Sequence, residues 1–384
     1  MRCKAETIAA RSGLNNDQQY GSVVPPIHLS SIYNFNGYNQ PRTHDYSRRS
    51  NPTRDIAQQA IAELEQGVGA VITNSGIAAL HLVCIIYLKP GDLMIAPHDC
   101  YGGSYRMIDS LSKRGIYRVI FIDQGDKKAF KEVLTREPKL VLIESPSNPL
   151  LRVVDIPYIC HTARSVGAIS VVDNTFLSPI LQNPLKLGAD LVIHSCTKYL
   201  NGHSDIIAGV VVANDADTLR EIAWWANNIG VTGAAFDTYL LMRGLRTLGA
   251  RITIAQKNAL AIVNYLKKQS HVKKIYHPSL PENNGHDFAV RQQKGFGAIL
   301  SFELDGNQQT IGEFLKSLTL FTLAESLGGV ESLISHTATM THAAMSEKAR
   351  QTAGISDMLL RISTGIENHE DLINDLDQAF RYIT

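Results

Sequence analysis

Short runs of consecutive apolar residues recur through the middle of the chain, separated by segments with helical periodicity. Each run is apolar at successive positions rather than at alternate ones. Continuous apolarity is typical of strands that are buried on both faces, and helical crossovers are what parallel strands require. The sequence therefore predicts an α/β fold with a mostly parallel sheet. The runs span residues 93–95, 119–122, 140–143, 169–172, 191–193 and 206–212.

The pattern changes twice along the chain, which predicts three regions. Residues 1–50 are polar, rich in turn formers and without strong periodicity, so we interpret them as an extended arm that contacts a neighbouring subunit. Residues 51–245 contain the apolar runs and form the main domain. In residues 246–384 a long helical pattern reaching about Lys268 precedes strand-like and helical segments, which predicts a smaller α+β domain. These segments lie at 298–302, 310–318, 359–363 and 372–380.

Charge and cysteine content limit the partners and the compartment. The net charge is +1 over 384 residues, which gives no support for a nucleic-acid or membrane partner. The five cysteines are odd in number and contain no C-x-x-C pair, which favours a reducing, cytoplasmic location. The N-terminus lacks the apolar core of a signal peptide, and charged residues interrupt the most apolar stretch, at 77–95.

Two polar residues stand at the ends of neighbouring apolar runs. Asp173 follows the run at 169–172, and Lys198 follows the run at 191–193 after Ser195 and Thr197. Alone, the aspartate would be a turn former and the lysine a solvated loop residue. Together they match the needs of pyridoxal 5'-phosphate: an amine that bonds to its aldehyde, an acid for its ring nitrogen, and hydroxyls for its phosphate.

Two further segments fit such a site, although each has an ordinary alternative. Ser75 and Gly76 precede a helical segment, where backbone N–H groups and the helix dipole would suit a phosphate. A Ser-Gly pair before a helix is nevertheless common. Tyr101 follows an apolar run and precedes two glycines, so it could stack on a flat ring or be an ordinary half-buried tyrosine.

These motifs together resemble a known family. Residues 190–204 match the cofactor-lysine signature of the Cys/Met-metabolism pyridoxal phosphate enzymes, a fold type I, aminotransferase-like group, and the resemblance spans essentially the whole chain. It is closest to the bacterial branch that performs γ-replacement. Further matching segments are residues 46–53, 101–104, 144–149 and 171–176.

The resemblance implies roles for the cofactor residues. Lys198 would hold the cofactor and shuttle protons, Asp173 would pair with the ring nitrogen, and Tyr101 would stack on the ring. Tyr46 and Arg48 would reach the cofactor phosphate of a neighbouring subunit, which implies a homotetramer built from active dimers. The phosphate would be surrounded by Ser75, Gly76, Ile77, Ser195 and Thr197. Ile77 departs from the methionine that relatives commonly carry, a change of little consequence if only its backbone N–H is used.

The resemblance also implies a substrate site. Arg361, in a strand-like segment, would clamp the substrate α-carboxylate, although an unknown fold would favour a solvent-facing edge residue there. Ser326 and Asn148 would complete this end. The distal end would be bound by charged residues that surface loops also explain: Asp45, Arg49, Arg106 and Glu325. An acidic residue at position 325 is associated with γ-chemistry in this family.

The reaction implied is γ-replacement in methionine biosynthesis. Succinate would leave Cγ of O-succinylhomoserine, and the thiolate of L-cysteine would add there to give cystathionine. Related activities remain open: γ- or β-elimination of cystathionine, elimination from methionine, and sulfhydrylation of an acetylated homoserine. Gly103 stands where methionine-cleaving relatives carry cysteine. A relative without cofactor could instead be a binding or regulatory protein, but the presence of Lys198 and Asp173 counts against it.

The histidines and cysteines do not predict other chemistry. His336 and His342 are six positions apart, not at the i, i+4 spacing of a helical metal-binding pair, and no carboxylate triad accompanies them. The sequence therefore predicts no metal site. Cys100 and Cys196 lie near the expected site without a histidine-based thiol arrangement, and we interpret them as small buried residues.

Overall fold

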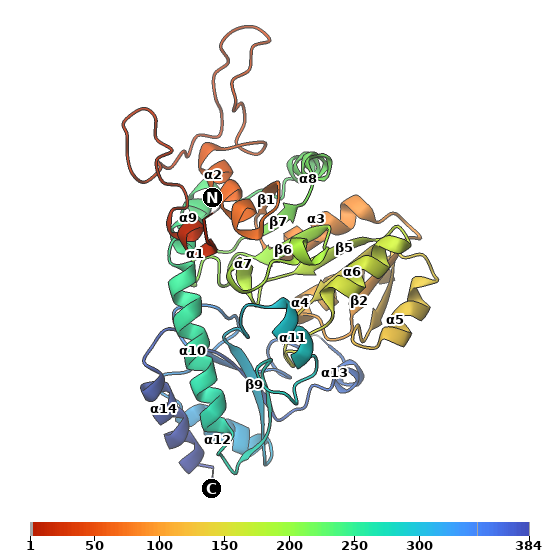
Figure 1. The fold of residues 1–384 in the computed structure, drawn as a ribbon, viewed down its shortest axis with the longest axis vertical. Coiled ribbons are helices and arrows are strands. Elements are labelled where there is room, and N and C mark those ends of the chain that lie inside the picture. The colour runs from red at the N-terminus through yellow and green to blue at the C-terminus, as the bar shows by residue number, and fades with distance from the viewer. Residues whose placement is uncertain (1–2, 344, 384) are drawn as a thin grey trace.

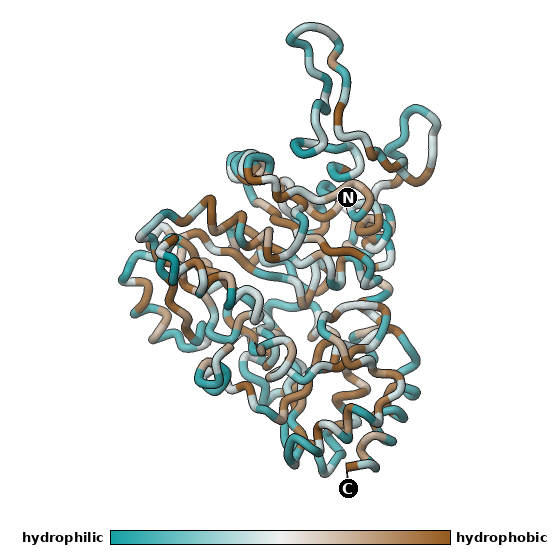
Figure 2. The backbone as a smooth tube through the Cα atoms, turned by 180° about the vertical axis from the view of Figure 1, so that it is seen from behind, coloured by the Kyte–Doolittle hydropathy of each residue, from teal (hydrophilic) through white to brown (hydrophobic). Residues whose placement is uncertain are grey.

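The protein is built around two β-sheets connected by a long helix. The computed structural model describes residues 3–343 and 345–383. Figure 1 shows the larger sheet above the smaller one, with α10 (Leu248–Leu266) running alongside both. In Figure 2 the hydrophobic colour is concentrated in the two sheets, whereas the loops projecting at the top are mostly hydrophilic or neutral.

The larger sheet has seven strands in the order β1-β7-β6-β5-β4-β2-β3. Only β7 runs antiparallel to its neighbours, so the predicted mostly parallel sheet is confirmed. The strand β1 was not predicted, because its apolar run of three residues follows a glycine-rich turn. The strands are β1 (Gly69–Thr73), β2 (Leu93–Pro97), β3 (Arg118–Ile122), β4 (Leu140–Glu144), β5 (Ile169–Asp173), β6 (Leu191–Ser195) and β7 (Gly209–Ala213).

Helices cover both faces of this sheet. Val171 and Ile193 pack with α3, α4 and α8 on one face, while Val172 and Val192 face the helices of the other. Both faces are therefore buried, which explains the continuous apolar runs. The helices are α2 (Pro52–Glu65), α3 (Gly76–Tyr87), α4 (Gly102–Lys113), α5 (Lys127–Leu134), α6 (Ile156–Ser165), α7 (Ser178–Leu181), α8 (Ala216–Ile229) and α9 (Ala235–Leu245), with a 3-10 turn at Pro184–Leu187.

The smaller sheet has five strands in the order β10-β11-β12-β9-β8. Phe302 in this sheet packs against Phe314, whose ring centroid lies 4.9 Å from that of Phe380. These aromatic side chains fill the space between the sheet and its helices. The elements are β8 (Val272–Tyr276), α11 (His286–Gln292), β9 (Ile299–Leu304), α12 (Gln308–Ser317), β10 (Thr322–Leu323), β11 (Leu333–His336), α13 (Glu347–Ala353), β12 (Leu359–Ser363) and α14 (His369–Arg381).

The N-terminal region corrects one prediction. Residues 1–50 were expected to be extended throughout, but Ala5–Ala10 form the helix α1, which packs on α2 and α10 of its own chain. Ala9 is buried there. A helix of six residues is too short to show periodicity, so the sequence did not reveal it. Residues 11–50 contain no helix or longer strand, and they project away from the sheets (Figure 1).

None of the helices in the described part of the chain has the length and apolarity needed to cross a membrane.

Candidate active site

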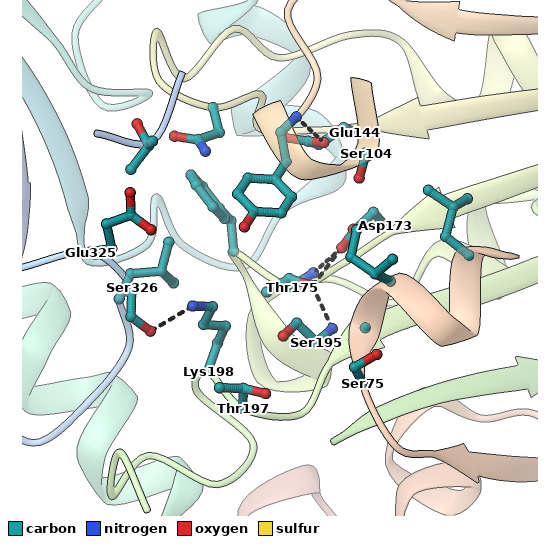
Figure 3. A pocket seen from close by; sticks show the side chains of 18 of the residues that line it. Ser75, Ser104, Glu144, Asp173, Thr175, Ser195, Thr197, Lys198, Glu325 and Ser326 are labelled. Atoms are coloured by element: carbon teal, nitrogen blue, oxygen red, sulfur yellow. Dashed lines mark hydrogen bonds between the residues drawn. The ribbon is translucent and has the colours of Figure 1, made fainter. Parts of the chain in front are cut away.

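A cavity of about 350 Å³ opens at the carboxyl ends of β4, β5 and β6. This is where parallel α/β sheets place their ligands. Figure 3 shows its polar side chains converging from the large sheet on one side and from the segment at 325–326 on the other. The sequence-predicted residues that line it are Ser75, Gly76, Ile77, Tyr101, Asn148, Asp173, Ser195, Thr197, Lys198, Glu325, Ser326 and Arg361.

Lys198 lies just beyond β6, and its Nζ donates a hydrogen bond of 2.5 Å to Oγ of Ser326. Burial and the positive charge of Arg361 lower the pKa of Lys198 to about 8, against an opposing effect of Glu325. A lysine with a lowered pKa carries more free amine at neutral pH than a solvated lysine does. The environment therefore suits a lysine that attacks an aldehyde.

Asp173 ends β5 and receives two hydrogen bonds from Thr175, at 2.9 Å from its backbone nitrogen and 2.5 Å from its hydroxyl. Both reach Oδ1. Burial raises the pKa of Asp173, while the two Thr175 bonds act in the opposite direction. A cationic ring nitrogen placed in the cavity would favour the ionised carboxylate, since an opposite charge nearby lowers a carboxyl pKa.

The N-terminus of α3 borders the same cavity. Ser75 caps this helix by accepting a bond of 3.1 Å from the backbone nitrogen of Ala78. A Cβ atom on Gly76 would lie 2.8 Å from Cβ of Ser195, so only glycine lets the two segments approach so closely. Backbone N–H groups at a helix N-terminus beside the Ser195 and Thr197 hydroxyls form a set of donors suited to phosphate.

Tyr101 precedes α4, and its backbone nitrogen donates to Oε2 of Glu144 at 2.9 Å. A Cβ atom on Gly103 would lie 2.5 Å from Cε1 of the Tyr101 ring. Gly103 therefore leaves the space that this ring occupies. Tyr101 is 41% exposed and lines the cavity, so it can contact a ligand there.

Arg361, on β12, is only 3% exposed, so it is not a solvent-facing edge residue. Its Nη1 donates to Oδ1 of Asn148 at 2.9 Å and its Nη2 to the carbonyl of Ser326 at 2.8 Å. Nε is buried without a hydrogen-bond partner among the described residues. Burial lowers the pKa of Arg361 to about 10, which leaves it cationic at neutral pH. A buried, incompletely bonded guanidinium fits an anionic substrate group.

The residues predicted to bind the distal end of the substrate do not all lie at the cavity of one chain. Glu325 lines the cavity. Asp45 and Arg49 form an ion pair of 2.9 Å within the arm and do not line the cavity of their own chain. Arg106 is an exposed residue on α4, outside the lining but close enough for its charge to act on Tyr101.

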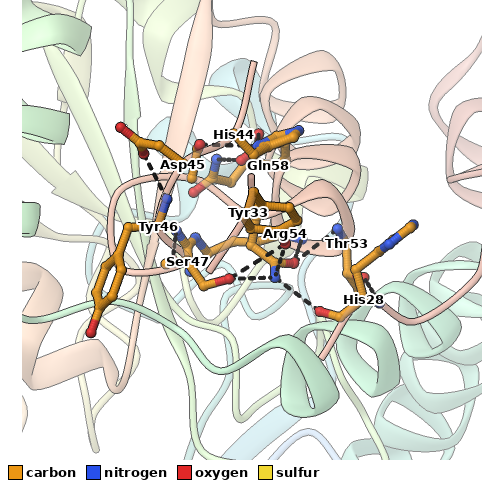
Figure 4. A network of polar contacts seen from close by, with 12 residues as sticks. His28, Tyr33, His44, Asp45, Tyr46, Ser47, Thr53, Arg54 and Gln58 are labelled. Atoms are coloured by element: carbon orange, nitrogen blue, oxygen red, sulfur yellow. Dashed lines mark hydrogen bonds and ion pairs between the residues drawn. The ribbon is translucent and has the colours of Figure 1, made fainter. Parts of the chain in front are cut away.

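The base of the arm is held by a polar network. Asn51 donates to the carbonyl of His28 at 2.9 Å, and Arg54 donates to the carbonyl of Ser47 at 2.7 Å. Figure 4 shows the Tyr46 ring pointing away from this network. Arg48 lies over that ring and donates to Asn227 of α8, so neither residue reaches the cavity of its own chain.

Sequence reasoning did not single out several residues that line the cavity. Thr175 could have been found, because a hydroxyl two positions after a strand-end aspartate is placed to bond it. Glu144 was noted only as part of a matching segment, although burial and the nearby Asp173 raise its pKa well above its usual range. Thr341 comes from a distant loop and carries no local signal. The missed residues are Leu80, Ser104, Glu144, Pro146, Thr175, Phe176, Ile207, Leu327 and Thr341.

The residues that line the cavity provide a suitable partner for each chemical group of pyridoxal phosphate. The cavity offers a lysine with a lowered pKa, a buried carboxylate, an aromatic ring and a helix N-terminus with adjacent hydroxyls. The orphaned Nε of Arg361 adds a place for a substrate carboxylate.

Comparisons with known proteins agree with this fit. Residues 6–381 match the family model described as Cys/Met metabolism PLP-dependent enzyme. The chain is 72% identical over 381 residues to the cystathionine gamma-synthase of Escherichia coli, covering 99% of both chains. A cystathionine beta-lyase of Lactococcus lactis is 42% identical, with 97% of this chain and 98% of the relative covered.

Two solved structures are also highly similar to this chain. The crystal structure of cystathionine gamma synthase from Xanthomonas oryzae in complex with cystathionine superposes with a TM-score of 0.99. It is 52% identical and covers 100% of this chain and 99% of its own. A second crystal structure of that enzyme contains aminoacrylate and cysteine and has the same TM-score.

Proposed function

This chain belongs to the Cys/Met metabolism PLP-dependent enzyme family, and on that premise we propose that it performs γ-replacement on O-succinylhomoserine with L-cysteine, giving cystathionine and succinate. Enzymes of this family use pyridoxal 5'-phosphate. The observation that carries the proposal is the 72% identity, over the full chain, to a curated cystathionine gamma-synthase. The same reaction would place the protein in methionine biosynthesis.

The cofactor residues would act as a set. When bound, pyridoxal phosphate supplies an electron sink for a carbanion at the substrate Cα. Lys198 would hold the cofactor, then take the proton from Cα and return protons to the substrate. Its bond to Ser326 keeps the amine on the side of the cavity where Arg361 also lies. Asp173 would bind the ring nitrogen and Tyr101 would stack on the ring.

The phosphate and the amino acid would be bound at separate parts of the cavity. The phosphate would lie against the α3 N-terminus, contacting Ser75, Gly76, Ile77, Ser195 and Thr197. Arg361 would bind the α-carboxylate, supported by Asn148 and Ser326, which already bond its guanidinium. A buried arginine held from two sides orients the substrate at little further entropic cost.

The arm would complete the site of a second subunit. Tyr46 and Arg48 would reach the partner's phosphate, and Asp45 and Arg49 would join Glu325 and Arg106 around the distal end of the substrates. In support, large apolar side chains of the arm are exposed in the single chain: Leu29 is 71% and Tyr38 101% exposed. Such a surface is typical of a protein interface. We propose active dimers assembled into a cytoplasmic homotetramer.

The three regions predicted from the sequence would have separate roles. Residues 1–50 would serve as the arm, 51–245 as the cofactor-binding domain and 246–384 as the C-terminal domain. In support, the break between α9 and α10 falls at residues 246–247. This division places Lys198 and Arg361 on different domains, with the cavity between them.

A product assay tests the reaction. The holoenzyme is given succinyl, acetyl and phospho esters of homoserine, each with and without cysteine, and separately cystathionine alone. We expect cystathionine and succinate from the succinyl ester with cysteine, at a higher kcat/KM than from the other esters. Faster cleavage of cystathionine than its synthesis would instead assign the chain to the lyases, which include 42%-identical relatives.

A further inference from the structure

A buried polar network lies behind the cofactor cavity, and the proposed reaction does not use it. It is centred on Glu65, the last residue of α2, which is fully buried. Oε1 of Glu65 lies 2.6 Å from Nε2 of His194 and accepts a bond of 2.7 Å from Nδ2 of Asn174. His194 itself is 1% exposed.

From His194 on β6 and Asn174 after β5, the hydrogen bonds continue to the end of β4. Asn174 and Gln182 bond each other, because Nε2 of Gln182 donates to Oδ1 of Asn174 at 3.1 Å and Nδ2 of Asn174 donates to the Gln182 carbonyl at 2.9 Å. Nε2 of Gln182 also donates to the carbonyl of Ser145 at 3.0 Å. A chain of hydrogen bonds therefore joins Glu65 to Ser145, just beyond β4.

The sequence positions of these contacts relate them to the cavity. His194, Asn174 and Ser145 are the immediate neighbours of Ser195, Asp173 and Glu144, and all three of those neighbours line the cavity (Figure 3). His194 and Ser195 are successive residues of β6, so their side chains point to opposite faces of the sheet, whereas Asn174 and Ser145 are the first residues after β5 and β4. The network thus contacts the carboxyl ends of the three strands whose last residues line the cavity.

The choice of residue at position 65 argues for a role beyond filling space. A fully buried carboxylate is costly, and an apolar side chain of similar size would avoid that cost. Oε2 of Glu65 has no hydrogen-bond partner among the described residues, so the carboxylate is not even fully compensated. The two hydrogen bonds of Oε1 both go to residues at strand ends, His194 and Asn174.

We propose that Glu65 is a positioning residue, which acts through His194 and Asn174 to fix the strand ends that present Ser195 and Asp173 to the cofactor. The inference rests on the proposed function, because it assumes that the cofactor lies in this cavity. Displacements of about 1 Å would then matter, since catalysis depends on aligned reacting groups.

The test compares two substitutions in the holoenzyme. Glu65→Met removes both hydrogen bonds at similar volume, whereas Glu65→Gln keeps an oxygen acceptor. We expect Glu65→Met to lower kcat about tenfold or more, with KM nearly unchanged. The visible circular dichroism of the bound cofactor should change as well. Glu65→Gln should recover most of both properties.

A matched control separates positioning from stability. Asp375 is a buried carboxylate on α14 that accepts bonds from the backbones of Thr319 and Leu320, in the smaller sheet's helical layer. Asp375→Asn should lower Tm without changing kcat or the cofactor dichroism. The proposal is overturned if Glu65→Met retains wild-type kcat and dichroism, or if Asp375→Asn alters them equally.

A second pair of variants serves if Glu65→Met does not fold. His194→Gln keeps a donor toward Glu65 and His194→Phe does not, so only the latter should lose kcat and alter the dichroism. Equal effects of the two would reject the inference. A failure of the proposed reaction is distinguishable, because it would appear in the wild-type product assay while leaving the dichroism comparison intact.

Discussion

The amine of Lys198 lies 2.5 Å from the hydroxyl of Ser326, a residue 128 positions later in the chain. Lys198 follows a strand of the large sheet, and Ser326 follows β10 of the small one. The carbonyl of Ser326 also accepts a bond from Arg361. One short segment therefore contacts both the candidate catalytic amine and the candidate substrate arginine, so the candidate active site depends on how the two sheets pack together.

The lowered pKa of Lys198 predicts how the apoenzyme recaptures its cofactor. Only the free amine attacks the aldehyde, so the capture rate should rise with pH through a midpoint near the pKa of about 8. Arg361→Met should move that midpoint upward, because the arginine charge lowers the lysine pKa. Absorbance after mixing apoenzyme with pyridoxal phosphate measures the rate, and borohydride reduction with peptide mapping locates the label. A label on another lysine would refute the assignment of Lys198.

Arg361 should govern amino-acid binding more than cofactor binding. Arg361→Ala removes charge-assisted bonds to the α-carboxylate, which at about 3 kcal/mol in total corresponds to a roughly 100-fold loss in kcat/KM. Arg361→Lys keeps the charge but not the paired donors, so it should recover only part of this loss. Steady-state kinetics and the cofactor absorption spectrum are the measurements. Unchanged KM and kcat/KM in Arg361→Ala would remove the residue from the site.

Gly103 lies so close to the Tyr101 ring of this chain that one added methyl group should shift that ring. Gly103→Ala would place Cβ 2.5 Å from the Tyr101 ring and displace it from the cofactor face. We expect weaker cofactor affinity and an altered cofactor spectrum. Gly312→Ala, in α12, is the matched control because its Cβ would meet nothing within 4 Å, and it should raise stability by about 1 kcal/mol. Identical spectra for the Gly103 variant and the wild type would contradict this use of the ring.

The proposed sharing of the site predicts complementation between subunits. Lys198→Ala and Arg48→Ala should each have little activity when alone. Co-expressed with two affinity tags, they should form mixed dimers in which one site contains both native residues, so the doubly tagged fraction should regain activity. If Arg48 served its own subunit instead, each mixed dimer would hold no complete site and its activity would equal the mean of the two variants.

The clearest sequence signals belong to candidate site residues that lie close together in the chain. Asp173, Ser195 and Lys198 follow apolar runs, and strand-end positions can be read from the pattern of apolarity because parallel strands bury both faces. Residues whose partners lie far away carried weaker signals. The apolar residues beside Arg361 in the sequence are compatible with a solvent-facing position at a sheet edge. Its 3% exposure and its bond to Asn148 show instead that the side chain is buried.

The sequence by itself determined the fold class and identified Lys198 and Asp173 as candidate cofactor residues, because periodicity and short motifs are local properties of the chain. The tertiary structure decided the pKa values and the contacts of those residues. Burial and the Arg361 charge lower the Lys198 pKa, the packing of the two sheets brings Ser326 to its amine, and Glu65 meets His194 129 positions away behind the strand ends. Such contacts depend on how buried surfaces fit together, and that fit is set by the whole chain rather than by any one segment.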